Sequence, residues 1–150
     1  MSEQNAISQT KGFLDELYKN VKMGADSLID LMPKVSDKRL REEMTAELEH
    51  YEGFAKDIRA ILFADGEEPQ EESFMAKLGV KMGVMMNTMM DDTTSHIAEM
   101  MIKGATMGIT ATTKLIRESE NTSCSEEALA LARRIIGYEE ESIEKLKEFL

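Results

Sequence analysis

The sequence has no tryptophan and a single cysteine, Cys124. A lone cysteine cannot form an intramolecular disulfide, and the stretch "MSEQNAISQT" lacks the basic and apolar regions of an export signal. We therefore expect a reducing, cytoplasmic location. No apolar run approaches the roughly 20 residues that a membrane-spanning helix requires, so we expect no membrane association.

Basic residues are also scarce relative to acidic ones. Eighteen Lys and Arg stand against 29 Asp and Glu, which leaves a formal net charge of -11. A field of this sign repels phosphate backbones and anionic lipid headgroups. Nucleic-acid binding is therefore disfavoured.

Strand-forming patterns are absent as well. Aromatic residues make up only 5% of the chain, and Val, Ile and Thr never alternate with polar residues over the length of a strand. The two prolines, Pro33 and Pro69, fall where the hydrophobic period breaks. We predict an all-α protein, and its 150 residues are enough for one domain spanning 1–150.

Apolar residues at steps of three and four indicate four long helices. The first ends before Pro33, the second begins at Ser36 or Asp37 as its N-cap and ends near Asp65-Gly66, and short loops join the helices within each pair. The apolar stripes of these helices run from Phe13 to Leu31, from Leu40 to Leu62, from Thr93 to Leu115 and from Ala128 to Leu150, and a capping box of Ser123 and Glu126 begins the last helix.

The long connection over residues 65–92 contains a further helical pattern at 72–90. One continuous helix from Glu71 to Ser119 would be about 70 Å long and would overhang its partners, which are about 40 Å. The polar cluster "DDTTS" offers a new N-cap, so we predict a break near Asp91 to Thr94. Short loops then join the first helix to the second and the third to the fourth, and a long connection joins the second helix to the third.

Two carboxylates fall on the apolar faces of these helices. Glu47 lies between Met44 and Tyr51 in the second helix, and Glu139 lies between Ile135 and Ile143 in the fourth. An ionised carboxylate is costly there unless it is paired or bound to a metal. One interpretation is a polar layer, in which Glu47 and Glu139 are hydrogen-bonded to Tyr18, Tyr51, Ser142 or each other and the histidines are partly exposed.

The order of the elements resembles the ferritin-like superfamily, a four-helix bundle with one long crossover between its second and third helices. The resemblance also rests on "ELEH", where Glu47 and His50 match the Glu-x-x-His motif, and on "EEES", where Glu139 matches an inward carboxylate. It implies a divalent metal, Fe, Mn or Zn, as a possible cofactor. The sequence departs from the family pattern at Ser142, where a histidine is expected.

A metal site would therefore use Glu47, His50 and Glu139, with His96 and Glu99 from the third helix as further candidates. Glu139 is expected level with Gly104, which places His96 some 12 Å away along the axis by helical rise. The candidate ligands do not converge on one level by this estimate, and the polar layer remains the alternative.

Methionines mark one face of the crossover helix. Met82, Met85, Met86, Met89 and Met90 follow helical spacing, which fits core lining, a copper(I) site, or a surface for a protein partner or a second copy in a homo-oligomer.

Mid-helix glycines at Gly24, Gly104 and Gly108 suggest a close approach of the first and third helices.

No phosphate loop, dinucleotide fingerprint or nucleophile elbow occurs, and no histidine is near Cys124 in the sequence. We therefore expect a non-enzymatic binding, scaffolding or oligomeric protein with a ferritin-like bundle. The alternative is a metal-binding ferritin-like protein with a partial carboxylate and histidine site.

Overall fold

Five α-helices make up most of residues 3–64, 73–83 and 93–150, which the computed structural model describes. They are α1 (Glu3–Leu31), α2 (Lys38–Leu62), α3 (Phe74–Gly83), α4 (Thr94–Ser119) and α5 (Glu126–Leu146), with short 3-10 turns η1 (Met32–Lys34) and η2 (Lys147–Phe149) after α1 and α5. No strand occurs in this part of the chain, which confirms the all-α prediction.

The helix starts follow local capping chemistry. Asp37 is the N-cap of α2, and its Oδ1 accepts a hydrogen bond of 2.8 Å from the backbone N–H of Leu40. Thr93 caps α4, so the predicted break before this helix is confirmed. The fourth long helix differs from the prediction, because its N-cap is Ser125 and not Ser123.

The shift of this cap has a physical reason. With Ser125 as the N-cap, Glu126 and Glu127 both lie in the first turn, where the helix dipole favours negative charge. The backbone N–H of Ser123 instead donates to the side chain of Gln9 at 2.7 Å, and that of Ser125 donates to Thr10 Oγ1 at 3.0 Å. The loop between α4 and α5 is thus hydrogen-bonded to the early part of α1.

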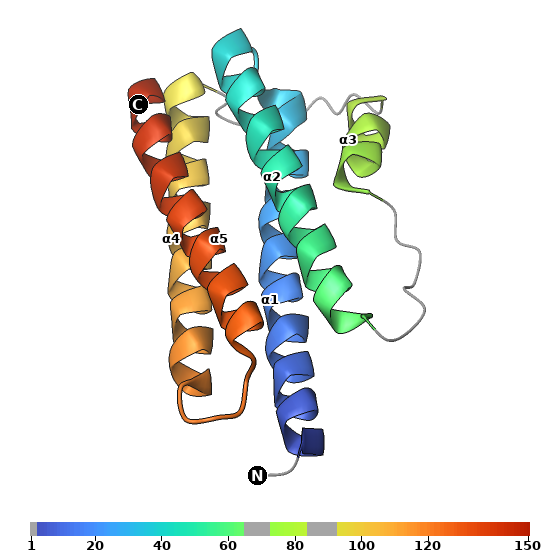
Figure 1. The fold of residues 1–150 in the computed structure, drawn as a ribbon. Coiled ribbons are helices and arrows are strands. Elements are labelled where there is room, and N and C mark those ends of the chain that lie inside the picture. The colour runs from blue at the N-terminus through green and yellow to red at the C-terminus, as the bar shows by residue number, and fades with distance from the viewer. Residues whose placement is uncertain (1–2, 65–72, 84–92) are drawn as a thin grey trace.

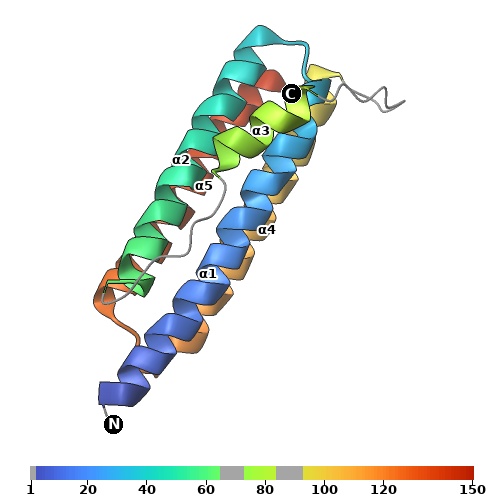
Figure 2. The ribbon, with the colours of Figure 1, turned by 90° about the vertical axis from the view of Figure 1, so that its right-hand side faces the viewer.

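The four long helices pack side by side (Figure 1). α1 packs mainly against α2 and α4, and α5 packs mainly against α4 and α2, with a smaller contact between α1 and α5. Figures 1 and 2 show α2 and α4 beginning at the same end of the molecule, so these two helices run parallel. The chain therefore crosses the length of the helices between the end of α2 and the start of α4.

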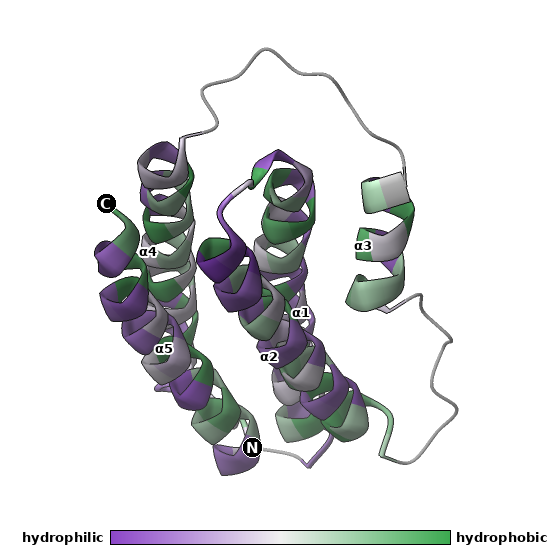
Figure 3. Cartoon of the chain, turned by 90° about the horizontal axis from the view of Figure 1, so that it is seen from above, coloured by the Kyte–Doolittle hydropathy of each residue, from purple (hydrophilic) through white to green (hydrophobic). Residues whose placement is uncertain are grey.

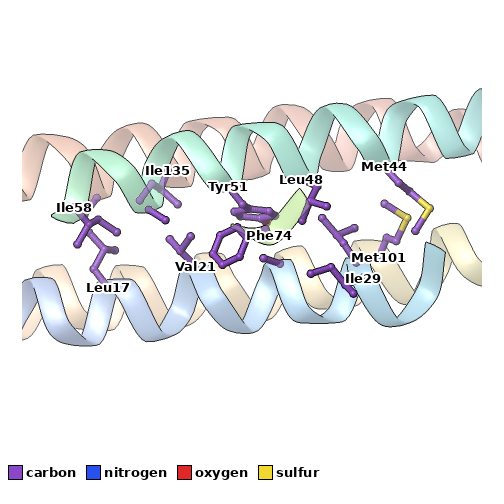
Figure 4. Packing of buried hydrophobic residues seen from close by; sticks show 14 of the residues in the cluster. Leu17, Val21, Ile29, Met44, Leu48, Tyr51, Ile58, Phe74, Met101 and Ile135 are labelled. Carbon is purple, nitrogen blue, oxygen red and sulfur yellow. The ribbon is translucent and has the colours of Figure 1, made fainter. Parts of the chain in front are cut away.

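A single apolar core lies between these helices. Figure 3 shows, looking along the helices, that apolar residues gather on the sides that face one another. Leu17, Leu40 and Leu48 are fully buried, and Figure 4 shows Leu17 and Leu48 among other core side chains of α1, α2, α4 and α5. Burial of such a stripe from each helix is the main source of stability in helical proteins of this size.

The short helix α3 lies against α1, α2 and η1. Its first residue, Phe74, is only 2% exposed and lies among the buried side chains in Figure 4. The Phe74 backbone N–H donates to Glu52 Oε2 at 3.0 Å, and Lys81 pairs with Asp30 on α1 at 3.3 Å. A helix in the predicted connection is confirmed over Phe74–Gly83, whereas 84–90 lie outside the described residues.

No helix in the described ranges is both long enough and apolar enough to cross a bilayer.

Candidate functional site

Glu47 is the most enclosed carboxylate of α2. Helical spacing places it on the same face as Met44 and Tyr51, and only 3% of the residue is exposed. Ser142 of α5 donates its hydroxyl proton to Glu47 Oε1 at 2.5 Å. The second carboxylate atom, Oε2, is buried and has no hydrogen-bond partner among the described residues.

Glu139 lies on the buried face of α5 and is 4% exposed. The Tyr51 hydroxyl of α2 donates to Glu139 Oε2 at 3.3 Å. On the other side, the carboxylate lies over the backbone of Gly108 in α4, so closely that a Cβ at position 108 would overlap Glu139 Oε2. The absence of a side chain at position 108 is what makes room for this carboxylate.

Two of the predicted partners thus hold the carboxylates. The interpretation of Glu47 and Glu139 as a polar layer with Ser142 and Tyr51 is confirmed by these two hydrogen bonds. The hydroxyl of Tyr18, the third partner considered from the sequence, accepts a hydrogen bond from Arg59 Nη1 at 3.3 Å.

Burial raises the pKa of both carboxyl groups from 4.5 to about 7. For Glu47, the hydrogen bond from Ser142 lowers the pKa, the charge of Glu43 raises it and that of Lys145 lowers it, all by less than burial does. For Glu139, the bond from Tyr51 lowers the pKa and the charge of Glu47 raises it. Both groups therefore change protonation near neutral pH, and each is sensitive to the charge on the other.

A cavity of about 220 Å³ lies beside this pair, between α1 and α4. Its polar lining residues are Glu47, Tyr51 and Glu139, with Asn20 and Ser27 of α1. The rest of the wall is mostly apolar and contains Met23, Gly24, Leu28 and Leu31 of α1 together with Met100, Met101, Gly104, Ala105, Met107 and Gly108 of α4. Met23 is 64% exposed and Met107 is 69% exposed, so the cavity wall includes residues at the molecular surface.

The glycines of this wall correct one prediction from the sequence. Close approach of α1 and α4 through Gly24, Gly104 and Gly108 is wrong. A Cβ at Gly24 would lie 3.3 Å from Cζ of Tyr51, a Cβ at Gly108 would meet Glu139, and a Cβ at Gly104 would have no neighbour within 4 Å. The missing side chains make space for Tyr51, for Glu139 and for the cavity, which the sequence signalled only as unexplained mid-helix glycines.

The predicted ligand His50 lies away from this layer. It is exposed, and its ring stacks on Tyr138 with centroids 4.2 Å apart and an angle of 15° between the planes. Its Nδ1 lies 2.9 Å from the carbonyl oxygen of Ala46. Glu47 and His50 share a helix and a motif spacing, yet the inner carboxylate and the outer ring have different partners.

His96 and Glu99 also have separate surroundings. His96 lies in the first turn of α4, where its backbone N–H is capped by Thr93 Oγ1 at 3.2 Å. Glu99 is exposed and pairs with Lys103 at 3.2 Å. Of the five predicted ligands, the structure brings Glu47 and Glu139 together, and the described residues include no group of three or more His, Cys, Asp or Glu placed to hold a metal ion.

The methionine face of the crossover is only partly described. Met82 is half-buried and packs against the core, as expected for core lining. Met85, Met86, Met89 and Met90 lie outside the described residues, and the partner surface predicted for them stays a prediction.

Comparison of the chain with protein-family models, curated protein sequences and solved structures gave no match.

Proposed function

We propose that this chain is a non-enzymatic binding protein that receives a small molecule in the cavity between α1 and α4. The observation that carries the proposal is the cavity itself, a mostly apolar recess with a few polar groups, among them the buried side chains of Glu47, Tyr51 and Glu139. Ligand sites commonly combine an apolar wall with a small number of placed polar groups.

Binding fits these polar groups better than catalysis does. The Tyr51 hydroxyl donates to Glu139 and the Ser142 hydroxyl donates to Glu47, so each hydroxyl is committed to a carboxylate. Cys124 lies in the loop before α5, and it is not among the residues that line the cavity. Ser142 is likewise not among the lining residues, so neither its hydroxyl nor the thiol of Cys124 borders the cavity.

We further propose that the bundle is ferritin-like in its topology. Three features support the assignment: the short connections within each helix pair, the long connection between α2 and α4, and the parallel course of those two helices. The meeting of Glu47 and Glu139 between α2 and α5 adds support from the site.

Cavity filling tests the binding proposal. Gly104→Leu places a side chain where a Cβ has open space, and Gly137→Leu makes the same change at an exposed glycine of α5 that does not line the cavity. The measurement is titration with N-phenyl-1-naphthylamine, a neutral dye whose fluorescence rises in apolar surroundings. We expect Gly104→Leu to weaken dye binding at least about tenfold, which is 1.4 kcal/mol, and Gly137→Leu to bind like the wild type.

Equal dye binding by the wild type and both leucine variants would overturn the proposal, as would absence of dye binding by the wild type. Circular dichroism melts of the same samples establish that both variants are folded.

A divalent metal ion held by the carboxylate pair is the second candidate function. The unpartnered Oε2 of Glu47 favours it, because a buried carboxylate oxygen is costly without a donor or a cation. Glu47 and Glu139 would hold the ion through oxygen atoms, and water would complete its coordination, since zinc sites usually have at least three protein ligands.

Calorimetric titration of chelator-treated protein with Mn²⁺, Fe²⁺ and Zn²⁺ tests this second candidate. Glu47→Gln should abolish binding of the ion, while Glu49→Gln, an exposed carboxylate on the same helix, should leave it unchanged. Heat changes that are the same for both variants would exclude Glu47 as a ligand.

A further inference from the structure

The cavity has two buried acidic groups and no basic one. Its lining residues include Glu47 and Glu139 but no Lys, Arg or His. α1 contributes the neutral polar residues Asn20 and Ser27, and α4 contributes no ionisable side chain to the wall. Negative charge on the pair is thus not compensated from within the cavity.

One carboxylate atom also lacks a donor. Glu47 Oε1 accepts from Ser142 and Glu139 Oε2 accepts from Tyr51. Glu47 Oε2, in contrast, has no partner among the described residues, although Glu47 is only 3% exposed. An unmade hydrogen bond at a buried acceptor costs stability, and a ligand that supplies the donor recovers that cost. The unpartnered Glu47 Oε2 is thus a second observation, separate from the negative charge of the two carboxylates.

We infer that the ligand of the cavity is a protonated amine on an apolar body, whose ammonium group donates to Glu47 Oε2 and to the carboxylate of Glu139. The inference rests on the proposed function, since it names the chemistry of the molecule that the cavity receives. The aliphatic or aromatic part of the ligand lies against the methionine and glycine wall, where flexible thioether side chains adapt to its shape. The net charge of -11 attracts such a cation over a longer range.

The test compares three probes of equal chain length and different charge on chelator-treated, full-length protein. At pH 8, hexylamine is a cation, hexanol is neutral, and hexanoate is an anion. Displacement of N-phenyl-1-naphthylamine gives the affinity of each. At pH 8 we expect hexylamine to bind at least about tenfold more tightly than hexanol and hexanoate to bind most weakly, since hydrogen bonds to charged groups are the stronger ones.

Variants test which carboxylate causes the preference for the amine over the alcohol. Glu47→Gln should reduce the ratio of amine to alcohol affinity to near one while hexanol still displaces the dye, and Glu49→Gln should keep the wild-type ratio. Glu139→Gln gives an independent check should Glu47→Gln fail to fold.

The outcomes separate the two proposals. Equal binding of hexylamine and hexanol at pH 8, with dye binding still lost in Gly104→Leu, would overturn the amine inference and leave the binding function in place. An amine preference that persists undiminished in both Glu47→Gln and Glu139→Gln would also overturn it. Failure of every probe to displace the dye, together with an unaffected Gly104→Leu, would overturn the binding function.

Discussion

The two flanks of α1 are built differently. On the flank toward α2, the helix α3 covers the groove, with the buried ring of Phe74 among the core side chains. On the flank toward α4, glycines and methionines line a cavity of about 220 Å³, and its wall includes the exposed side chains of Met23 and Met107.

Side-chain size accounts for the difference. A phenylalanine ring fills the space at the first flank, and hydrogen bonding to Glu52 fixes the start of α3 there. At the second flank, Gly24 and Gly108 leave room that Tyr51 and Glu139 partly take, and Gly104 leaves room that no described side chain takes. The same helix α1 therefore contributes to a filled groove on one side and to a candidate binding site on the other.

The largest expected effect on stability comes from removing the Phe74 side chain, which fills the flank of α1 toward α2. Phe74→Ala removes a buried aromatic side chain, so we expect the free energy of unfolding to fall by about 3 to 5 kcal/mol. Urea unfolding followed by circular dichroism measures it. Met75→Ala, at a neighbouring residue that is 37% exposed, serves as the control and should lower stability by less than about 1 kcal/mol. Similar losses in the two variants would show that Phe74 does not seal the groove.

The next effect concerns the acidic side of the open flank. The pKa of Glu47 rises from 4.5 to about 7 on folding, so the native state binds more protons than the unfolded state between these pH values. The stabilising contribution of its protonated form is present below about pH 4.5 and is lost as the pH rises through about 7. The free energy of unfolding of Glu47→Gln, relative to wild type, should therefore increase by up to about 3 kcal/mol between pH 4.5 and pH 8.

Urea unfolding at several pH values measures this trend, with Glu49→Gln as the matched control for loss of one exposed negative charge. Parallel pH profiles for wild type and Glu47→Gln would contradict the burial of an ionisable group at this position.

A smaller effect on stability, of opposite sign at the two positions, is expected for alanine at Gly104 and at Gly108, which lie one turn apart on α4. Gly104→Ala adds a methyl group in open space and should stabilise the helix by about 1 kcal/mol. Gly108→Ala should instead lower the free energy of unfolding, because its Cβ displaces the Glu139 carboxylate that bonds to Tyr51. Thermal melts of both variants test the contrast, and equal stabilisation by the two alanines would remove Gly108 from the site.

The smallest effect on stability is expected at the opening of the cavity. Met23→Ser changes a side chain that is 64% exposed, so the free energy of unfolding should stay within about 0.5 kcal/mol of wild type. Binding of N-phenyl-1-naphthylamine should nevertheless weaken, since part of the apolar wall is lost. Unchanged dye affinity would place the bound dye away from the side of the cavity that Met23 forms.

The helices and the inner carboxylates were predictable because both follow local rules. Helical periodicity placed Glu47 and Glu139 on buried faces, and short polar residues marked the caps at Asp37 and Thr93. The start of the last helix was misplaced at Ser123, since the contacts that decide it come from Gln9 and Thr10, far away in the sequence.

The cavity was not predictable from the sequence, because it depends on which helices the glycines face. The spacing of Gly24, Gly104 and Gly108 fits close helix packing as well as it fits a recess. The direction of the His50 side chain was not predictable either, because a residue three positions after Glu47 can lie at the edge of the buried face. In the structure His50 is exposed and its ring stacks on Tyr138.

The hydrogen bonds from the loop before α5 to α1 have a consequence for folding. They join residues 114 and 115 positions apart, Gln9 with Ser123 and Thr10 with Ser125, and so close most of the chain into a ring. Closing so large a loop costs chain entropy that only a nearly complete core repays, whereas each helix pair joined by a short connection forms from local contacts. The start of α1 and the loop before α5 are therefore expected to form one late cooperative unit, although they lie near opposite ends of the sequence.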